Sequence, residues 1–402
     1  MKEDAIYLVP RAYPNTNGGT QHNIGTCKYL TRYFDMTMIS LLDSRYAMSE
    51  AEKKFENCGF NLIFYYSGKK KNFKDTFCML ESVDMEIMNS ILQIIKSKKI
   101  SWVFFTIKML PYMQGLKRIY PGIKYIYVSH NAEYRNIMQD IIQYDRMNAV
   151  NIMRHIIKLL QGQAFIMAER QAIKSSDMVF SISEYDSELL AGKYHTSFEK
   201  FILNKPMIPY MRRENNLKWK DTNYTNKLLI VGNMNWYPTV NGTIHFIDHI
   251  FTKLKTNESD LQLFVVGANP AQELIDRGRK DTSITITGYV KSVSEYYEQC
   301  DIAIVPIYEG TGAKLKVLEA LGNDIPVVIT EYVAKDYEGI QNAAIVCEND
   351  DEMLSAIREL IGNELKRKQL CEKEEIYYSE YMKENRYVDR YFEGRKKNCT
   401  TE

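Results

Sequence analysis

The sequence has no long apolar run. No stretch reaches the eighteen or so consecutive apolar residues of a membrane-spanning helix, although 45% of the 402 residues are hydrophobic. The opening stretch MKEDAIYLVP (1–10) carries acidic residues where a secretory signal peptide has its apolar region. We therefore expect neither a membrane span nor a leader peptide, and we expect the chain to stay in the cytoplasm.

Paired cysteines are also lacking. The seven cysteines are odd in number, scattered along the chain and free of CxxC pairs. A disulfide framework or a structural zinc site would need regular, closely spaced pairs. We expect reduced cysteines that serve packing.

The chain has little net charge, +1 in total, but the charge is unevenly distributed. Lys and Arg outnumber Asp and Glu in residues 1–205, and the reverse holds in residues 206–402. Basic clusters in the first half, KKKNFK (69–74) and KSKK (96–99), could face phosphate-rich partners or an anionic membrane surface. An ordinary solvated charged face is the alternative. We expect no nucleic-acid partner.

Strand-like and helix-like segments alternate along the chain, which is typical of parallel sheets with crossover helices. The length suits two domains, each with its own core. The first series of predicted strands is AIYLVP (5–10), MTMISLL (36–42), ISWVFFT (100–106), IKYIYVS (123–129) and DMVFSIS (177–183). The second is KLLIVG (227–232), LQLFVVG (261–267), ITITGYV (284–290), DIAIVP (301–306), IPVVIT (325–330) and AAIVC (343–347).

A polar, aperiodic stretch with two prolines separates the two series and is expected to be a linker. We predict four parts: an N-terminal domain over 1–205, the linker over 206–226, a C-terminal domain over 227–375, and a helical tail over 376–402 that packs back toward the N-terminal domain.

The stretch EGTGAKLKVLEALGNDIPVVIT (309–330) follows a buried strand and leads into a helix with one apolar face. Its glycines lie at the carboxyl edge of a parallel sheet, where open α/β folds bind ligands and where backbone N–H groups can approach a phosphate. Lys316 and Glu319 are three positions apart and share a helix face. They suit a phosphate and the hydroxyls of a ribose. The alternative is an ordinary surface pair. Lys314 points to another side of the helix and is the weaker phosphate candidate.

Two shorter patterns occur in the first half. The pair Gly18 and Gly19 precedes a helix and could bring backbone amides to an anion, although a plain turn is the alternative. Neither half shows the G-x-G-x-x-G pattern of dinucleotide-binding proteins after its first strand. His130, Asn131 and Glu133 follow a predicted strand, and a capped helix start would also explain them.

Four separated segments resemble, in the right order, the retaining GT-B glycosyltransferases of family 4, or group 1, of the kind that build bacterial surface polysaccharides. The main segment is GYVKSVSEYYEQCDIAIVPIYEGTGAKLKVLEALGNDIPVV (288–328), which resembles the donor-nucleotide region. The other three are LLIVGNMNWYPTVNGTIHFI (228–247), VPRAYPNTNGGTQHNIGTCKYLTRYFDMTMIS (9–40) and YVSHNAEYRN (127–136).

The resemblance implies an α/β fold with two Rossmann-like domains facing across a cleft. It implies that Glu319 binds the donor ribose, that Lys316 contacts the donor diphosphate and that His130 lies beside the transferred sugar, so that these three are the catalytic candidates. Asn131 and Glu133 are acceptor-side candidates. The implied donor nucleotide and phosphate residues are Gly18, Gly19, Gly232, Asn233, Tyr289, Val290, Thr311, Gly312, Ala313, Lys314, Lys316, Leu318 and Glu319.

The sequence departs from the family pattern at two places. Thr311 stands where the first glutamate of the E-x7-E motif is usual, and Glu309 lies two residues too early to replace it without a shifted loop. Asn233 and Met234 stand where the family has an arginine after the first donor strand.

The resemblance further implies a nucleotide-diphosphate sugar as co-substrate, with UDP or GDP favoured over dTDP, and no bound metal or other cofactor. The acceptor would be a hydroxyl of a glycan or lipid-linked glycan, with possible peripheral contact to the inner face of the plasma membrane. In the front-face mechanism usually proposed for this family, the departing phosphate takes the acceptor proton. Two other classes stay open: a non-catalytic GT-B partner subunit, suggested by Thr311, and a GT-B-like nucleotide-sugar epimerase.

Overall fold

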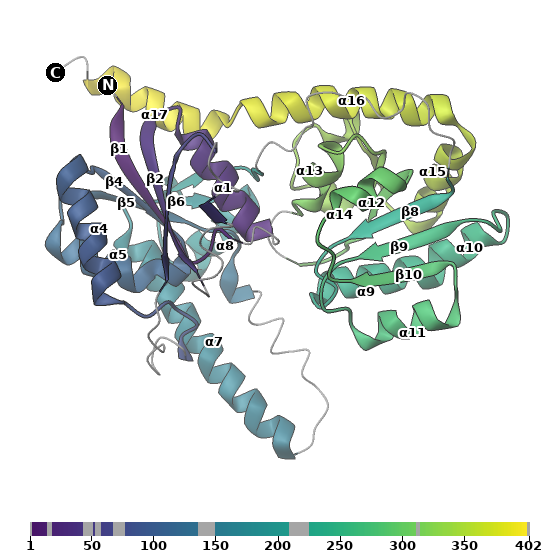
Figure 1. Ribbon diagram of the computed structural model, residues 1–402, viewed down its shortest axis with the longest axis horizontal. Coiled ribbons are helices and arrows are strands. Elements are labelled where there is room, and N and C mark those ends of the chain that lie inside the picture. Colours follow the sequence, from purple (N-terminus) through teal and green to yellow (C-terminus); the bar gives the residue numbers. More distant parts are fainter. Residues whose placement is uncertain are drawn as a thin grey trace. The chain divides into compact units, whose positions relative to one another are not determined.

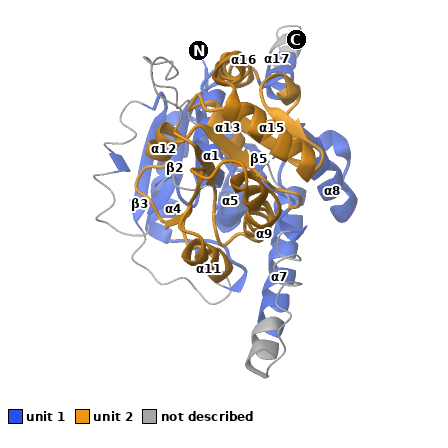
Figure 2. Ribbon diagram, turned by 90° about the vertical axis from the view of Figure 1, so that its right-hand side faces the viewer, with its two compact units in different colours: residues 1–209, 311–313, 385–402 blue, residues 210–310, 314–384 orange. Residues whose placement is uncertain are grey.

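The computed structural model describes residues 2–13, 18–42, 51–52, 58–66, 77–135, 149–208, 225–310 and 314–399. It divides into two compact units, coloured separately in Figure 2: unit 1 contains residues 1–209, 311–313 and 385–402, and unit 2 contains residues 210–310 and 314–384. The chain returns to unit 1 for its C-terminal part at residue 385, nine residues after the expected start of the helical tail at 376. In the described part of the chain, no helix is both long and apolar enough to cross a membrane.

Unit 1 is built on a parallel sheet with the strand order β3-β2-β1-β4-β5-β6-β7. Its strands are β1 (Glu3–Val9), β2 (Phe34–Leu42), β3 (Asn61–Tyr66), β4 (Trp102–Phe105), β5 (Lys124–Val128), β6 (Met178–Ser181) and β7 (Phe201–Leu203). All five predicted strands are present. The edge strands β3 and β7 were not predicted, and β7 is too short, at three residues, to show a periodic pattern.

The helices of unit 1 lie around this sheet, and α7 projects beyond it over part of its length (Figure 1). They are α1 (Gly18–Leu30), α4 (Met85–Lys98), η2 (Ile107–Met109), α5 (Leu110–Ile119), α7 (Ala149–Ser175), α8 (Glu184–Tyr194), η3 (Phe198–Lys200) and α17 (Arg386–Cys399). The C-terminal helix α17 belongs to unit 1: Phe392 packs on Phe34 and Trp102, and Asp389 accepts a 2.7 Å hydrogen bond from the Tyr29 hydroxyl.

Unit 2 has a second parallel sheet, with the order β10-β9-β8-β11-β12-β13. All six of its strands were predicted: β8 (Lys227–Val231), β9 (Gln262–Val266), β10 (Ile284–Gly288), β11 (Ile302–Val305), β12 (Val327–Thr330) and β13 (Ile345–Cys347). Both β11 and β12 are buried at every position, because helices cover both faces of a parallel sheet of this kind.

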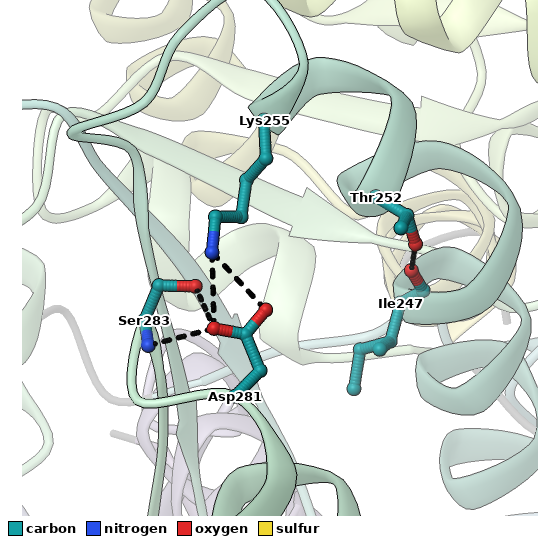
Figure 3. A network of polar contacts seen from close by, with 5 residues as sticks. All are labelled: Ile247, Thr252, Lys255, Asp281 and Ser283. Atoms are coloured by element: carbon teal, nitrogen blue, oxygen red, sulfur yellow. Dashed lines mark hydrogen bonds and ion pairs between the residues drawn. The ribbon is translucent and has the colours of Figure 1, made fainter.

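The helices of unit 2 are α9 (Tyr237–His245), the π-helical η5 (Phe246–Phe251), α10 (Thr252–Lys255), α11 (Gln272–Lys280), α12 (Ser294–Gln299), α13 (Lys316–Leu321), α14 (Glu331–Ala334), η6 (Ile340–Asn342), α15 (Asp350–Gly362) and α16 (Glu364–Lys383). Figure 3 shows polar contacts that link α10 to η5 and to the turn between α11 and β10. Asp281 accepts hydrogen bonds from Ser283 and from Lys255 on α10, and Thr252 Oγ1 donates to Ile247 O over 2.6 Å, inside the π-helical turn.

Both sheets contain the strand order 3-2-1-4-5-6 that is characteristic of Rossmann-like folds, and in unit 1 the strand β7 extends it at one edge. In this order, the connection after one of the two central strands runs toward one edge of the sheet, and the connection after the other runs toward the opposite edge. The central strands are β1 and β4 in unit 1 and β8 and β11 in unit 2. Ligands of such folds bind outside the carboxyl ends of these strands. The loops after β8 and β11, and those after β1, β4 and β5, are therefore the places to look for a site.

Candidate functional site

In unit 2, the loops after β8 and β11 meet around one lysine. Gly232 directly follows β8, and Lys316 begins α13 after the β11 loop. A Cβ atom added to Gly232 would lie 2.9 Å from Lys316 Nζ and 2.9 Å from Thr239 Cγ2. The missing side chain at Gly232 therefore leaves the space that the lysine ammonium occupies.

Lys316 is half-buried and held by groups from α9. Its Nζ atom donates a hydrogen bond to Thr239 Oγ1 over 3.0 Å and lies 5.9 Å from the centre of the Trp236 ring. Burial lowers the pKa of Lys316 to about 8; the charge of Lys314 also lowers it, whereas that of Glu319 raises it. A cation without full hydration at a strand-switch point is suited to an anionic ligand.

Glu319 lies one turn further along α13 and is half-buried. Its negative charge is close enough to favour the protonated form of Lys316. The apolar residues on the other side of this helix, Val317, Leu318 and Leu321, are buried, and Leu315 ahead of it is 7% exposed. The predicted helix with one buried face and one Lys/Glu face is confirmed.

The loop between β11 and α13 is partly outside the described residues, and with it Thr311, Gly312 and Ala313. Its described part before this gap ends at Gly310, whose φ of +104° favours glycine and whose added Cβ would lie 2.9 Å from Pro238 Cγ. The neighbouring Glu309 accepts a hydrogen bond from Asn241 Nδ2 over 3.2 Å. Glu309 is thus tied to α9.

Two predicted donor residues are buried inside unit 2. Lys314 precedes α13, and its Nζ atom lies 3.0 Å from Asp336 Oδ2 and 4.7 Å from the centre of the Tyr332 ring, with 3% of the side chain exposed. Leu318 has no exposed surface. The ammonium of Lys314 is therefore engaged by Asp336, and the Leu318 side chain is part of the core.

The other predicted residues of unit 2 lie at strand ends. Asn233 is exposed in the loop after β8, where its Oδ1 atom accepts a 3.2 Å hydrogen bond from Asn235 N. Tyr289 and Val290 follow β10, and Tyr289 is 65% exposed. An exposed aromatic ring at the carboxyl edge of a sheet is available for stacking on a nucleobase.

In unit 1, the pair Gly18 and Gly19 forms the start of α1, as predicted. The first backbone N–H groups of a helix have no acceptor within it, and they lie at the positive end of the helix dipole. The four residues before Gly18 lie outside the described part of the chain.

His130 lies at the end of β5, half-buried, with its Nε2 atom 2.7 Å from Asn23 Oδ1 on α1. Its ring meets that of His22 edge to face, with 5.5 Å between the ring centres. Burial lowers the pKa of His130 to about 4, and the nearby Lys108 also lowers it. The imidazole is therefore neutral at physiological pH.

Two buried carboxyl groups hold the loop that carries His130. Asp186 Oδ1 accepts from Ala132 N over 3.1 Å, and Glu169 Oε1 accepts from Glu133 N over 2.9 Å. Glu169 Oε2 also accepts from the Tyr194 hydroxyl over 2.6 Å. Burial raises the pKa of Glu169 to about 8, although these hydrogen bonds work against the rise. Asp186 on α8 and Glu169 on α7 therefore fix the backbone after His130, because they accept hydrogen bonds from the loop that follows β5.

The acceptor-side candidates lie in the same loop. Asn131 and Glu133 are half-buried, and the Asn131 Nδ2 atom lies 3.4 Å from Glu133 Oε1. The structure thus brings His130, Asn131 and Glu133 together at the carboxyl end of β5, in unit 1, and gathers Gly232, Lys316 and Glu319 at the switch point of unit 2.

Sequence reasoning missed several residues of these two clusters: Asn23, Glu169, Trp236 and Thr239. Thr239 and Trp236 lie within the segment WYPTVNG, and Asn23 lies one turn after Gly19, so all three were inside segments already singled out. No local pattern marked Glu169, which lies in the middle of the long helix α7.

Residues 225–363, within unit 2, match the family model of the glycosyl transferases group 1. No curated protein matches the chain in a sequence comparison.

Solved structures resemble the chain over nearly its whole length. WaaG, a glycosyltransferase involved in lipopolysaccharide biosynthesis, has 16% identity, a TM-score of 0.60, and coverage of 95% of this chain and 96% of its own. HepE from Anabaena, in complex with UDP and glucose, has 10% identity, a TM-score of 0.62 and full coverage of both chains. A variant of TarM from S. aureus, with fondaparinux, alpha-GlcNAc-glycerol and UDP, has 10% identity, a TM-score of 0.64 and coverage of 99% of each chain.

At these identities the structural likeness shows the fold, which is the GT-B fold predicted from the sequence. Together with the family match, it shows that the chain carries a group 1 glycosyltransferase domain within a GT-B fold. The predicted enzyme class, a glycosyltransferase, is confirmed. A protein from Listeria monocytogenes described as a UDP-N-acetylglucosamine 2-epimerase shares the fold, with a TM-score of 0.51, 10% identity and coverage of 92% and 91%.

Proposed function

We propose that this enzyme is a retaining glycosyltransferase that moves a sugar from a nucleotide diphosphate to a hydroxyl of a glycan or lipid-linked glycan. The observation that carries the proposal is the position of Lys316. It is a half-buried cation in the space left by Gly232. This space lies at the carboxyl ends of the two central strands of the sheet, β8 and β11.

In this proposal unit 2 binds the donor. Lys316 contacts the diphosphate, and Glu319 accepts hydrogen bonds from the ribose hydroxyls, as a carboxylate at this edge does in related folds. Tyr289 and Val290 lie beside the base. Because charge builds on the diphosphate as the glycosidic bond breaks, a cation fixed in advance stabilises the transition state more than the ground state.

Unit 1 supplies His130, which we place next to the transferred sugar, while Gly18 and Gly19 offer backbone amides to the diphosphate. The acceptor hydroxyl attacks the anomeric carbon from the same face that the phosphate leaves, as the bond to the phosphate breaks, and the hydroxyl proton passes to the departing phosphate oxygen. No protein general base is then required, and the anomeric configuration is retained. The UDP and sugars bound to HepE and TarM support a nucleotide-sugar donor of this kind.

A thermal-shift screen tests this proposal directly. UDP or GDP and their sugars should raise the unfolding temperature, since a ligand that binds the native state stabilises it by mass action, and dTDP should do so less. A product with the donor's anomeric configuration should form when an acceptor is added. Formation of an epimer from donor alone would establish the epimerase instead, and no stabilisation by any nucleotide would indicate a non-catalytic subunit.

We also propose that unit 1 contacts an anionic membrane through an apolar groove between α4, α5 and α7. The groove is a cavity of about 510 Å³ lined by Cys78, Leu80, Val83, Met85, Met88, Leu110, Pro111, Gln114, Gly115, Arg118, Ile119, Ala164, Met167, Ala168 and Gln171. Large apolar side chains at its rim are exposed: Met167 by 63%, Met85 by 59% and Ile119 by 54%. Leu160, two turns before Met167 on α7, is 55% exposed.

Such a surface, with Arg118 among its residues, combines apolar area with positive charge. Each basic residue near an anionic leaflet contributes about 1 kcal/mol to binding, and apolar side chains add to this by entering the interface. The chain should therefore sediment with anionic vesicles but less with neutral ones, and high salt should weaken the binding. Met167→Glu should reduce sedimentation, whereas Ile376→Glu, at an exposed apolar residue of unit 2, should not. Equal recovery with both vesicle types would contradict the proposal.

A further inference from the structure

The side chain of Asn23 connects three elements of unit 1. Asn23 lies on α1, is 3% exposed, and its Oδ1 atom is 2.7 Å from His130 Nε2 at the end of β5. The same oxygen lies 2.5 Å from the hydroxyl of Tyr7 on β1. A single amide oxygen is thus shared by a phenol and an imidazole that come from the two strands flanking β4.

The direction of these hydrogen bonds follows from the chemistry of the three groups. Tyr7 is completely buried, and burial raises the pKa of its phenol well above the ordinary value, so the hydroxyl keeps its proton. That hydroxyl donates to Asn23 Oδ1, which has two lone pairs and can only accept. His130 Nε2 faces the same oxygen and must therefore donate as well. In a neutral imidazole the other nitrogen, Nδ1, then carries no proton.

The surroundings keep the imidazole of His130 neutral. In the part of the chain that the structure describes, the titratable groups recorded against it are Lys108 on η2, whose positive charge opposes a second cation, and His22 on α1. His22 is itself neutral, because burial lowers its pKa to about 3 and its Nδ1 atom accepts a 3.1 Å hydrogen bond from Met207 N. Neither neighbour offers a negative charge that would favour imidazolium.

We propose that Asn23 is a positioning residue, which holds His130 with its proton on Nε2 so that Nδ1 accepts a hydrogen bond from a hydroxyl of the transferred sugar. This inference rests on the function proposed above, since it deepens the role given to His130. The inference requires that the sugar hydroxyl at His130 Nδ1 is a hydrogen-bond donor. A sugar that lacks this hydroxyl, or bears a methyl ether in its place, would bind without this hydrogen bond. Tyr7 orients Asn23, so a series of hydrogen bonds leads from Tyr7 on β1 through Asn23 on α1 and His130 to the sugar.

The first measurement is of the tautomer in the whole protein without donor. Long-range proton–nitrogen correlation spectra of ¹⁵N-histidine-labelled protein distinguish a protonated Nε2 from a protonated Nδ1, with His130→Gln used to assign the signal. We expect Nε2 to carry the proton in the parent. A proton on Nδ1 would overturn the proposal, whatever the activity of the enzyme.

The second measurement compares Asn23→Asp, Asn23→Leu and, as a matched control, Thr26→Val. Thr26 lies on the same helix and is equally buried, and its Oγ1 atom lies 3.4 Å from His22 Nε2. Asn23→Asp keeps an acceptor toward Nε2 but adds a negative charge, so it should raise the pKa of His130 and move the acid limb of the kcat profile up by about one pH unit or more. Thr26→Val should leave the limb where it is in the parent.

Asn23→Leu keeps the volume and removes the acceptor. We expect its turnover to fall about tenfold, as for one lost hydrogen bond to the substrate, with donor affinity within about twofold of the parent. Parent-like turnover and an unchanged pH profile in both Asn23 variants would overturn the proposal. If Asn23→Leu fails to fold, the Asn23→Asp profile and the parent's tautomer still decide. Absence of nucleotide binding by the parent would instead count against the proposed function and leave the tautomer result intact.

Discussion

Lys316 Nζ donates a hydrogen bond to Thr239 Oγ1 over 3.0 Å, across 77 positions of sequence. The contact joins α9, the first helix of unit 2, to the start of α13, the helix that follows its fourth strand. It places a lysine whose pKa is lowered to about 8 against the backbone of Gly232. The predictions for unit 2 follow from this pair and from the carboxylate one turn away.

Replacing Lys316 by Met should lower turnover by on the order of a hundredfold, because the charge acts mainly on the transition state. Met keeps the packing of the side-chain stem, so the free energy of unfolding should change little. Steady-state kinetics and urea denaturation measure the two effects. Lys314→Met is the control. It removes the partner of Asp336, so it should lower the free energy of unfolding by about 3 kcal/mol, but the folded variant should lose less turnover than Lys316→Met. An active Lys316→Met enzyme would show that the phosphate lies elsewhere.

The lowered pKa of Lys316 predicts an alkaline limb. The ammonium is present below its pKa of about 8 and is lost as the pH rises through that value, so kcat/KM should fall above about pH 8. The limb reports the free enzyme. In Lys316→Arg the guanidinium stays charged, so the limb should disappear from this range even if the rate is lower throughout. A limb that persists in Lys316→Arg belongs to another group.

Glu319→Ala should weaken donor binding. The variant loses hydrogen bonds from the ribose to a charged acceptor, worth about 1.5–3 kcal/mol, so the dissociation constant should rise about tenfold or more while the fold survives. Calorimetric titration with the nucleotide selected by the thermal-shift screen measures this change. Glu331→Ala, at an exposed residue of α14 in the same unit, should bind like the parent. Unchanged affinity in Glu319→Ala would refute the assignment.

The buried carboxyl of Glu169 should make stability depend on pH. Burial raises its pKa from the ordinary 4.5 to about 8, so between these values the folded chain keeps a proton that the unfolded chain has released. The contribution of Glu169 to the free energy of unfolding is complete below about pH 4.5. It is lost as the pH rises toward 8, by up to about 1.4 kcal/mol per pH unit. Glu169→Gln cannot titrate. The free energy of unfolding of the parent should therefore fall relative to that of Glu169→Gln between pH 5 and pH 8. A constant difference between the two proteins would show that Glu169 is ionised throughout this range.

The local sequence determined the elements and the class of this protein. Continuous β-branched and apolar runs such as VVIT in β12 and IAIV in β11 can be satisfied only inside a parallel sheet, and their alternation with amphipathic helices predicted both units. Lys316 and Glu319 could be paired from sequence, because three positions on a helix bring two side chains to one face whatever the rest of the chain does. The edge strand β7 could not be predicted from the sequence, since a strand of three residues shows no periodic pattern.

Only the tertiary structure decided which distant groups meet. Lys314 resembled a second phosphate ligand, but folding brings Asp336 to within 3.0 Å of its ammonium, because a cation that becomes buried needs a counter-charge. Asn23 and His130 are 107 positions apart and share a hydrogen bond because β1 and β5 flank β4 in the sheet, with α1 beside their carboxyl ends. Spacing along a chain predicts neighbours within one helix or strand. The neighbours of a side chain across elements depend on the order in which the strands assemble, and no local pattern records that order.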